Sequence, residues 1–188
     1  VQNQSLRSRV FLANNLALSG QNHLVSGAFQ SVLNGNQHTM TLSYNTQLSG
    51  DYHWINFSTN SQFMGQELLG SFVFNSTVMG SNHHLRHLDE AIVDGHNHVV
   101  DDLTQGEISG EGHVVLKSDQ LKLTGQSTYV NQSQSIHSMG SHHQIQFSSN
   151  SVVHGRDQRL FHADWTLVDG QNNRLSRVHQ SVVNGQGN

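Results

Sequence analysis

Apolar and polar residues follow each other along this chain in a unit of 15 residues. We number the unit so that its recurring glycine is the fifth position, and we call the residues at one position of successive units a column. The third and tenth columns are almost entirely apolar. Around them, positions one, three and five, and positions eight and ten, alternate with the period of two that strands show, not with the 3.6-residue period of a helix. The pattern predicts two short strands in each unit.

The glycine column sets the period and contains no insertion or deletion from one end of the chain to the other. Its members are Gly20, Gly35, Gly50, Gly65, Gly80, Gly95, Gly110, Gly125, Gly140, Gly155, Gly170 and Gly185. A chain of 188 residues then holds about 12.5 copies of the unit. A single coil buries too little to fold, so neighbouring coils must stack on one another. We therefore predict an all-β fold, a β-solenoid of flattened two-strand coils with 15 residues per coil.

The two apolar columns are separated by seven residues one way and by eight the other, so they face each other across a thin coil. We expect turns near positions six to seven and thirteen to fifteen. The glycine is expected to give the first bend a positive φ angle or a close backbone approach. The predicted core is Leu18, Val25, Leu33, Met40, Leu48, Ile55, Phe63, Val78, Leu85, Val93, Val100, Ile108, Val115, Leu123, Val130, Ile145, Val153, Leu160, Val168, Leu175 and Val183.

The chain is predicted to be one repeat domain, 1–188, with a degenerate first coil over 1–15 and regular repeats over 16–188. Two core positions break the apolar pattern. Gly70 leaves a gap that Leu68, which replaces the usual histidine of that coil, is expected to fill. Ser138 is followed by the large Met139, which we expect to compensate for it.

Histidine dominates the eighth column, which we predict to be a polar ladder of stacked side chains. Its members are His23, His38, His53, His83, His98, His113 and His143, with Asn173 in a late coil. The simplest interpretation is an inward or turn-lining ladder in which histidine replaces asparagine. Neighbouring imidazoles suit at most adventitious Zn or Cu binding, because no carboxylate or thiolate recurs with them. We therefore predict no dedicated metal site and no cofactor. Protonation of closely stacked imidazoles should destabilise the rod below roughly pH 6.

Composition narrows the possible functions. The net charge of −4, with few Lys and Arg, argues against nucleic-acid and anionic-membrane partners, and no stretch reaches the roughly 20 apolar residues of a membrane-spanning helix. The absence of cysteine excludes a disulfide framework. No recurring Ser/His/Asp order, phosphate-binding loop or isolated carboxylate pair is present, so we predict no catalytic residues and no enzyme activity.

Several units resemble the curlin repeat of bacterial curli, which places a Gly three residues before an Asn, an apolar residue two further on, and a flanking Gln. The matching residues are Gly95, His98, Val100 and Gln105, and again Gly170, Asn173, Leu175 and Gln180. The resemblance implies a secreted, extracellular amyloid-like fibre of the biofilm matrix or cell surface, built from stacked strand-turn-strand coils.

Other units resemble the ryegrass antifreeze repeat, in which G-x-N-N-x-V units form an ice-binding β-roll. Gly20 to Val25 and Gly95 to Val100 are local matches. Ice binding requires a regular outward lattice, whereas the ninth and eleventh columns mix size and charge. An ice-binding solenoid and a rod segment of a surface adhesin remain the alternatives to the fibre subunit.

Self-association is the partner prediction that follows from a stack with unpaired strand edges, because such edges recruit further chains. We expect copies of the chain to add head to tail, and other matrix or surface components are further candidate partners. A lateral contact is predicted at Leu42, Phe57 and Phe72 in the twelfth column, with Trp54 nearby in the ninth.

Overall fold

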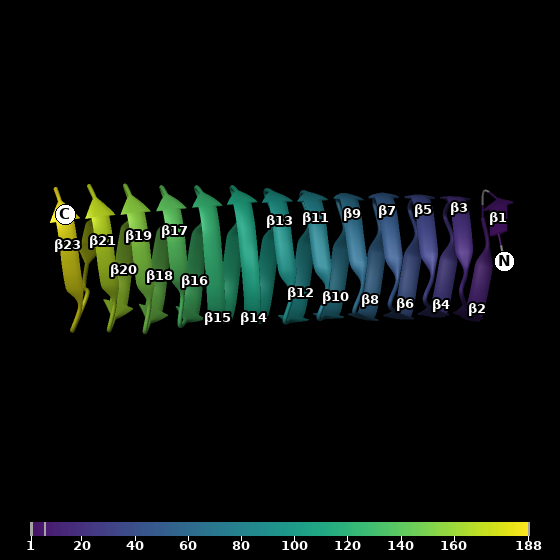
Figure 1. The fold of residues 1–188 in the computed structure, drawn as a ribbon, viewed down its shortest axis with the longest axis horizontal. Helices are drawn as coiled ribbons and strands as arrows, with labels where there is room; N and C mark the ends of the chain where they lie inside the picture. The colour runs from purple at the N-terminus through teal and green to yellow at the C-terminus, as the bar shows by residue number, and fades with distance from the viewer. Residues whose placement is uncertain (1, 6, 188) are drawn as a thin grey trace.

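The computed structural model describes residues 2–5 and 7–187, with side chains from residue 7 onward. These residues form 23 strands and no helix, wound into a straight β-solenoid whose N- and C-terminal coils lie at opposite ends of a rod (Figure 1). The described ranges therefore offer no helix that is long and apolar enough to cross a membrane. The predicted fold class is confirmed.

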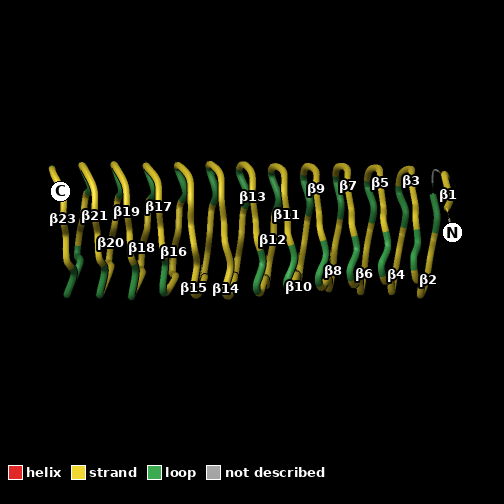
Figure 2. The backbone as a smooth tube through the Cα atoms, in the orientation of Figure 1, coloured by secondary structure: helices red, strands yellow, loops and turns green. Residues whose placement is uncertain are grey.

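Each coil contributes one strand to each of two facing layers, and Figure 2 shows the coil as a flattened loop with strand along both long sides. The strands at positions two to six are β1 (Gln2–Ser5), β3 (Ala17–Gln21), β5 (Val32–Asn36), β7 (Gln47–Asp51), β9 (Gln62–Gln66), β11 (Thr77–Ser81), β13 (Ile92–His96), β17 (His137–Ser141), β19 (Val152–Arg156), β21 (Leu167–Gln171) and β23 (Val182–Gln186).

The opposite layer is formed by the strands that start at position nine. They are β2 (Arg9–Asn14), β4 (Leu24–Phe29), β6 (Thr39–Tyr44), β8 (Trp54–Thr59), β10 (Leu69–Phe74), β12 (His84–Asp89), β16 (Tyr129–Gln134), β18 (Gln144–Ser149), β20 (Arg159–Asp164) and β22 (Arg174–Ser176). In the middle of the rod, β14 (Val99–Glu111) and β15 (Val114–Gln126) continue around the corner from one layer into the other.

Every pairing between described strands is parallel and joins residues 15 apart in sequence. Val78 pairs with Val93, and Val100 pairs with Val115, so like columns lie directly above one another. The register holds from the pairing of β1 with β3 to that of β21 with β23. The 15-residue sequence period is thus the translation from coil to coil, about 4.8 Å along the rod.

Besides the bend at the column-five glycine, three bends shape each coil, at positions seven, twelve and fifteen. Representative left-handed φ angles are 58° at Asn22, 55° at Leu42 and 50° at Asn45. The bends at seven and fifteen lie within the predicted turns. The bend at twelve was not predicted, because it falls on Leu42, Phe57 and Phe72, which are residue types that avoid positive φ. The bend at position twelve interrupts the alternation of the strand that starts at position nine. As a result, position thirteen faces inward, as position ten does.

The apolar core consists of four inward columns, the first, third, tenth and thirteenth, together with Leu68 of the buried eighth column. Columns three and ten are buried as far as Val168, whereas Leu175 is only partly buried. Val183 does not belong to the core, because its side chain is 42% exposed. Val183 lies on β23, which pairs only with β21 among the described strands, so no further coil covers it. The sequence interpretation also omitted the apolar members of columns one and thirteen, including Leu16, Val73 and Leu121.

In several coils, the residue in column thirteen of one unit and the residue in column one of the next unit compensate each other in size. Leu103 accompanies Gly106, and a Cβ atom added to Gly106 would lie 2.6 Å from Cδ1 of Leu103. One coil later the sizes are reversed, because Ser118 accompanies Leu121. A similar compensation in side-chain size occurs at Gly70, where the core column lacks its apolar side chain. There Leu68 is buried, and its Cδ2 would lie 3.2 Å from a Cβ on Gly70, which confirms that Leu68 fills this gap.

The second exception is not compensated as predicted. Met139 is 39% exposed and lies on the outer face, because position four points away from the core. Ser138 is fully buried, and its hydroxyl has no hydrogen-bond partner among the described residues.

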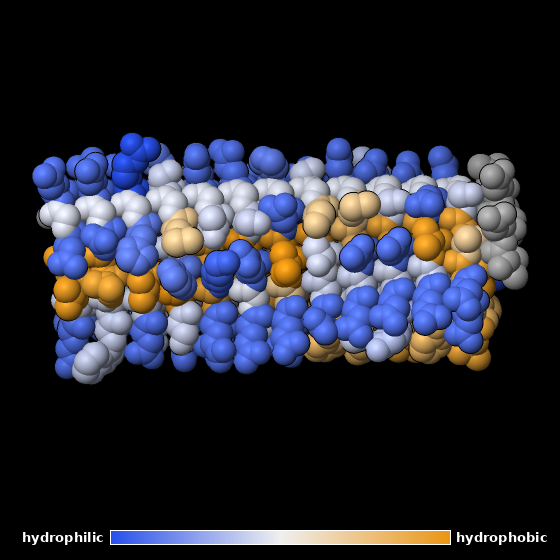
Figure 3. Space-filling view, viewed as in Figure 1, coloured by the Kyte–Doolittle hydropathy of each residue, from blue (hydrophilic) through white to orange (hydrophobic). Residues whose placement is uncertain are grey.

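The outer surface changes along the rod although the coil does not. In the N-terminal half, exposed Phe29, Leu42, Tyr44, Phe57 and Phe74 lie in columns twelve and fourteen. Figure 3 shows apolar colour along the lower edge of this half, whereas the lower edge of the C-terminal half is blue or pale. In the same columns, later coils carry charged residues such as Asp102 and Lys117.

Candidate functional site

The glycine column allows the coils to stack closely at the first bend. Its φ angles lie between 114° and 149°, a region that L side chains rarely adopt. In addition, a Cβ atom on any column-five glycine from Gly35 onward would overlap the carbonyl oxygen of the glycine one coil earlier. Both reasons anticipated from the sequence, positive φ and close approach, therefore apply at the same position.

The eighth column is a buried ladder directly beside this bend. Its seven histidines and Asn173 are each at most 2% exposed. Adjacent imidazoles stack face to face: the ring centroids of His23 and His38 are 4.9 Å apart, and those of His83 and His98 are 4.6 Å apart. The stack is interrupted by Leu68 and Thr128 and is followed by Gln158 before Asn173.

Hydrogen bonds fix the tautomer of the ladder histidines. The backbone N–H of His83 donates to Nδ1 of His98 at 3.2 Å, and the N–H of His98 donates to Nδ1 of His113 at 3.2 Å. An Nδ1 atom that accepts carries no proton, so the proton of the neutral ring lies on Nε2. Accordingly, Nε2 of His113 donates to the carbonyl oxygen of Ser109 at 3.0 Å.

The same acceptor role explains the residues that replace histidine in later coils. The N–H of His143 donates to Oε1 of Gln158 at 3.1 Å, and the N–H of Gln158 donates to Oδ1 of Asn173 at 3.0 Å. Where column eight holds His, Gln or Asn, it supplies a buried acceptor for the N–H of the preceding coil, either imidazole Nδ1 or an amide oxygen; Leu68 is an exception that offers none.

Six of the seven ladder histidines are held in the neutral form. Burial lowers the pKa of His38 to about 4, helped by the neighbouring His53, whereas the nearby backbone of Asn34 raises it. Burial likewise lowers the pKa of His98 to about 4, with His83 as the next cause. Burial is also the largest cause of the lowered pKa values of His53, His83, His113 and His143.

The hydrogen bonds of the ladder also bear on metal binding. A metal ion at His98 or His113 would displace a backbone hydrogen bond, because both nitrogens of each ring are already engaged. Across the described residues, no three His, Cys, Asp or Glu side chains are placed to share a metal ion. The exposed histidines contact single carboxylates instead, as His142 and His154 do with Asp157 and Asp169, each at 3.6 Å.

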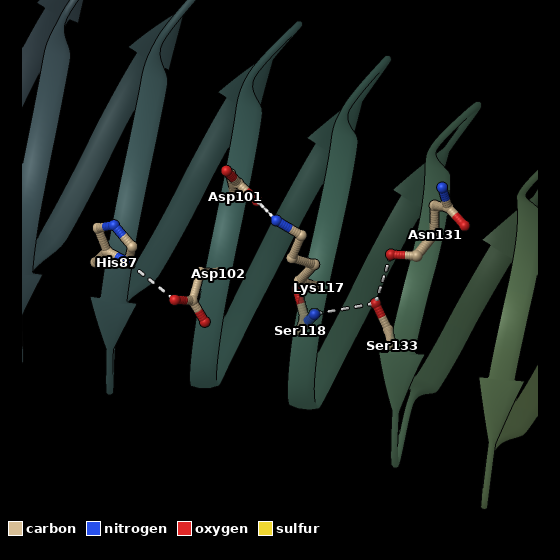
Figure 4. A network of polar contacts seen from close by, with 7 residues as sticks. All are labelled: His87, Asp101, Asp102, Lys117, Ser118, Asn131 and Ser133. Atoms are coloured by element: carbon tan, nitrogen blue, oxygen red, sulfur yellow. Dashed lines mark hydrogen bonds and ion pairs between the residues drawn. The ribbon is translucent and has the colours of Figure 1, made fainter.

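Outward polar side chains link neighbouring coils. Nδ1 of His87 lies 2.8 Å from Oδ2 of Asp102, and the Lys117 ammonium lies 3.8 Å from Oδ1 of Asp101 (Figure 4). Inside the coil, the N–H of the buried Ser118 donates to Oγ of the buried Ser133 at 3.2 Å (Figure 4). Lys122 and Glu107 pair at 2.8 Å on the opposite layer.

The predicted lateral-contact residues lie on the surface. Leu42, Trp54 and Phe57 are 60%, 57% and 45% exposed, and Phe72 is half-buried. Phe57 and Phe72 stack with ring centroids 4.6 Å apart, so much of each inner ring face is already covered. Column fourteen adds Phe29, Tyr44 and Phe74, which the sequence interpretation missed because it did not place the bend at position twelve.

No protein-family model matches the sequence, and no curated protein matches it. Solved structures give distant likenesses only. A TibA fragment hyper-glycosylated by TibC is 9% identical, with a TM-score of 0.41 over 98% of this chain and 97% of that chain. Tailspike protein 3 of bacteriophage CBA120 is 7% identical, with a TM-score of 0.38, and this chain spans 50% of its length. PfbA, a surface adhesin of Streptococcus pneumoniae, is 7% identical, with a TM-score of 0.34 over 99% and 82% of the two chains. At these values the likeness does not extend to function.

Proposed function

We propose that the protein is a structural subunit of an extracellular, curli-like fibre in the biofilm matrix or at the cell surface. In this fibre, solenoids stack head to tail and the partners are further copies of the chain. The observation that carries the proposal is the equivalence of the coil-to-coil interfaces. From β1 to β23, each coil meets the next by the same 15-residue, in-register parallel pairing.

This equivalence makes a coil of a second molecule a suitable continuation of the stack. It presents the same strand N–H and C=O groups and, in every coil but the first, which has Ser5 and Ser8 at these positions, the closely packed glycine and the column-eight side chain. A strand edge gains backbone hydrogen bonds when such a coil is added. The joining interface then uses the same parallel backbone pairing that already holds the molecule together.

The residues that resemble the curlin repeat occupy the positions that this assembly uses. Gly95 is at the close backbone approach, His98 is in the buried ladder, Val100 is in the core and Gln105 is at the last bend. These roles support the fibre over the ice-binding alternative, because the resemblance lies in residues that build the stack and not in an outward lattice.

Electron microscopy of the purified protein tests the proposal. We expect unbranched filaments that bind thioflavin and give a fibre-diffraction reflection at about 4.7–4.8 Å. Sonicated filaments should seed soluble protein, whereas a Gly95→Ala chain, in which the coils cannot approach, should neither elongate nor seed. Folded rods that stay discrete, at about 60 Å long, at all concentrations would contradict the fibre and favour the rod segment of an adhesin.

A further inference from the structure

Charged residues that are stacked one coil apart have opposite charge, with one exception. Four pairs of Lys, Arg, Asp or Glu are separated by 15 residues: Arg86 with Asp101, Asp102 with Lys117, Glu107 with Lys122, and Arg159 with Arg174. The first three pairs have opposite charge. Only Arg159 and Arg174 place two like charges on neighbouring coils.

The stacking of like columns gives no structural reason for two arginines at Arg159 and Arg174. The two residues are direct register partners on β20 and β22, about 4.8 Å apart along the rod, and both are exposed in column nine. None of the five ion pairs in the described part of the chain includes either guanidinium. Like charges directly opposite each other on neighbouring strands are destabilising. An external anion would remove this cost.

The surface on both sides of the two arginines is hollowed. One hollow, of about 450 Å³, is polar and is lined by His142, Gln144, Asp157 and Asn172 together with the arginines. Asp157 faces His142 there, at 3.6 Å, so this side already holds a negative charge. An anion bound by the arginines would lie away from this carboxylate.

The second hollow, of about 330 Å³, lies on the other side of the same arginines and is more apolar. Besides Arg159 and Arg174 it is lined by Leu160, Phe161 and Leu175, and by the polar side chains of Gln144, Gln146 and Ser176. The Phe161 ring is 37% exposed, and the Arg177 guanidinium carbon lies 5.5 Å from its centroid. An exposed ring surrounded by amides, a hydroxyl and guanidinium groups suits a ligand that has an apolar face, hydroxyl groups and a negative charge.

We propose that Arg159 and Arg174 form a binding site for an acidic saccharide, with one carboxylate or sulfate group held by both guanidinium groups. The sugar ring lies over Phe161, and its hydroxyls bond to Gln144, Gln146 and Ser176. Paired guanidinium groups are suited to bidentate recognition of such oxyanions. Nucleic acid is the poorer fit, because the chain carries a net charge of −4 and Asp157 lines the adjacent hollow.

Calorimetric titration tests the site with three hexasaccharides: a polyuronate, a sulfated glycan and an uncharged glucan. The Arg159→Gln/Arg174→Gln chain is compared with an Arg9→Gln/Arg86→Gln chain, which loses the same charge far from the site. We expect both acidic probes to bind the unaltered protein, and the site variant to lose affinity by about tenfold or more while the control changes by less than about twofold. The site variant should also melt at the same or a higher temperature, since like-charge repulsion is relieved.

Three results would overturn the proposal: equal loss of affinity in both variants, equal binding of the uncharged glucan, or competition by inorganic sulfate at the concentration of the sugars. Tighter binding of duplex DNA than of either acidic sugar would assign the arginines to nucleic acid instead. Ligand bound per chain can be measured on discrete rods and on filaments alike. The outcome is therefore independent of whether the protein forms fibres.

Discussion

Residues 10–85 and residues 86–177 form the same coil with different surfaces. The first region contains only two Lys, Arg, Asp or Glu residues, Asp51 and Glu67, and exposes a row of aromatic and aliphatic side chains. The second contains most of the chain's charges and links its coils by ion pairs. Strand register, glycine conformation and ladder hydrogen bonds are nevertheless the same in both. The inward columns and the glycines therefore specify the fold, and the outward columns are free to carry function.

The largest expected effect comes from the glycine column and should be equal in the two regions. Gly50→Ala and Gly155→Ala each place a Cβ against the carbonyl oxygen of the preceding glycine, at φ angles of 124° and 143°. We expect each to cost more than about 4 kcal/mol of unfolding free energy, or to abolish folding, in chemical denaturation.

Gly112→Asn is the matched control for these substitutions. Gly112 lies in column seven, where Asn22, Asn82 and Asn97 already adopt φ angles of 57° to 59°. We expect a change within about 1 kcal/mol, because asparagine tolerates this conformation. Tolerance of alanine at Gly50 but not at Gly155 would mean that the two regions do not share one coil geometry.

The size trade between columns one and thirteen gives the next largest effect. Leu103→Ser should cost about 2–4 kcal/mol by leaving a cavity, and Gly106→Leu about 1–3 kcal/mol by overpacking against Leu103. The double substitution reproduces the next coil, where Ser118 accompanies Leu121, and should recover most of the loss. A double-mutant cycle measured by denaturation shows the coupling, and purely additive losses would contradict the trade.

Acid should destabilise both regions through the histidine ladder. The pKa values of His38 and His98 are lowered from 6.5 to about 4 in the folded chain, so the unfolded chain binds these protons first. The stability is fully present above about pH 6.5 and is lost as the pH falls towards 4, by about 1 kcal/mol per pH unit for each such histidine.

The variant His98→Asn sharpens this prediction. Asparagine supplies the acceptor that Nδ1 provides, as Asn173 does in its own coil, but does not titrate. We expect little change in unfolding free energy at pH 8 and a gain relative to the unaltered chain at pH 5. An unchanged pH profile of thermal melting would argue against a buried neutral ladder.

Much of this architecture could be predicted from the sequence, because about twelve coils show the residue preference of each position repeatedly. Columns three, five, eight and ten each have one structural requirement, and the residue type indicates it: Val93 is buried in the core, and Gly95 allows the close backbone approach. The bend at position twelve could not be predicted, because Phe57 and Lys117 adopt positive φ against their own preference. The core role of Leu103 depends on that bend, and the acceptor role of the ladder Nδ1 atoms depends on the coil spacing. Neither feature can be recognised from the residue types alone.

The smallest effect should appear only in the charged region. Lys122→Gln breaks the exposed pair with Glu107, and we expect a cost of about 0.2–1 kcal/mol at low salt that disappears in about 1 M NaCl. Gln62→Ala, at the same position of the neutral region, should show no salt dependence. A salt-dependent loss at Gln62 would mean that electrostatics reach further along the rod than the ion pairs indicate.

The central claim is the in-register stack, and pulsed electron paramagnetic resonance distances test it directly. The chain contains no cysteine, so cysteines for spin labels can be placed at chosen column-two positions: Gln47 with Lys122, with His137 and with Val182. These pairs are five, six and nine coils apart, so the stack predicts distances of about 24, 29 and 43 Å, rising linearly at about 4.8 Å per coil. Labelled chains diluted in unlabelled protein keep the measurement within one molecule. Distances that do not rise in proportion to the number of coils would contradict the account.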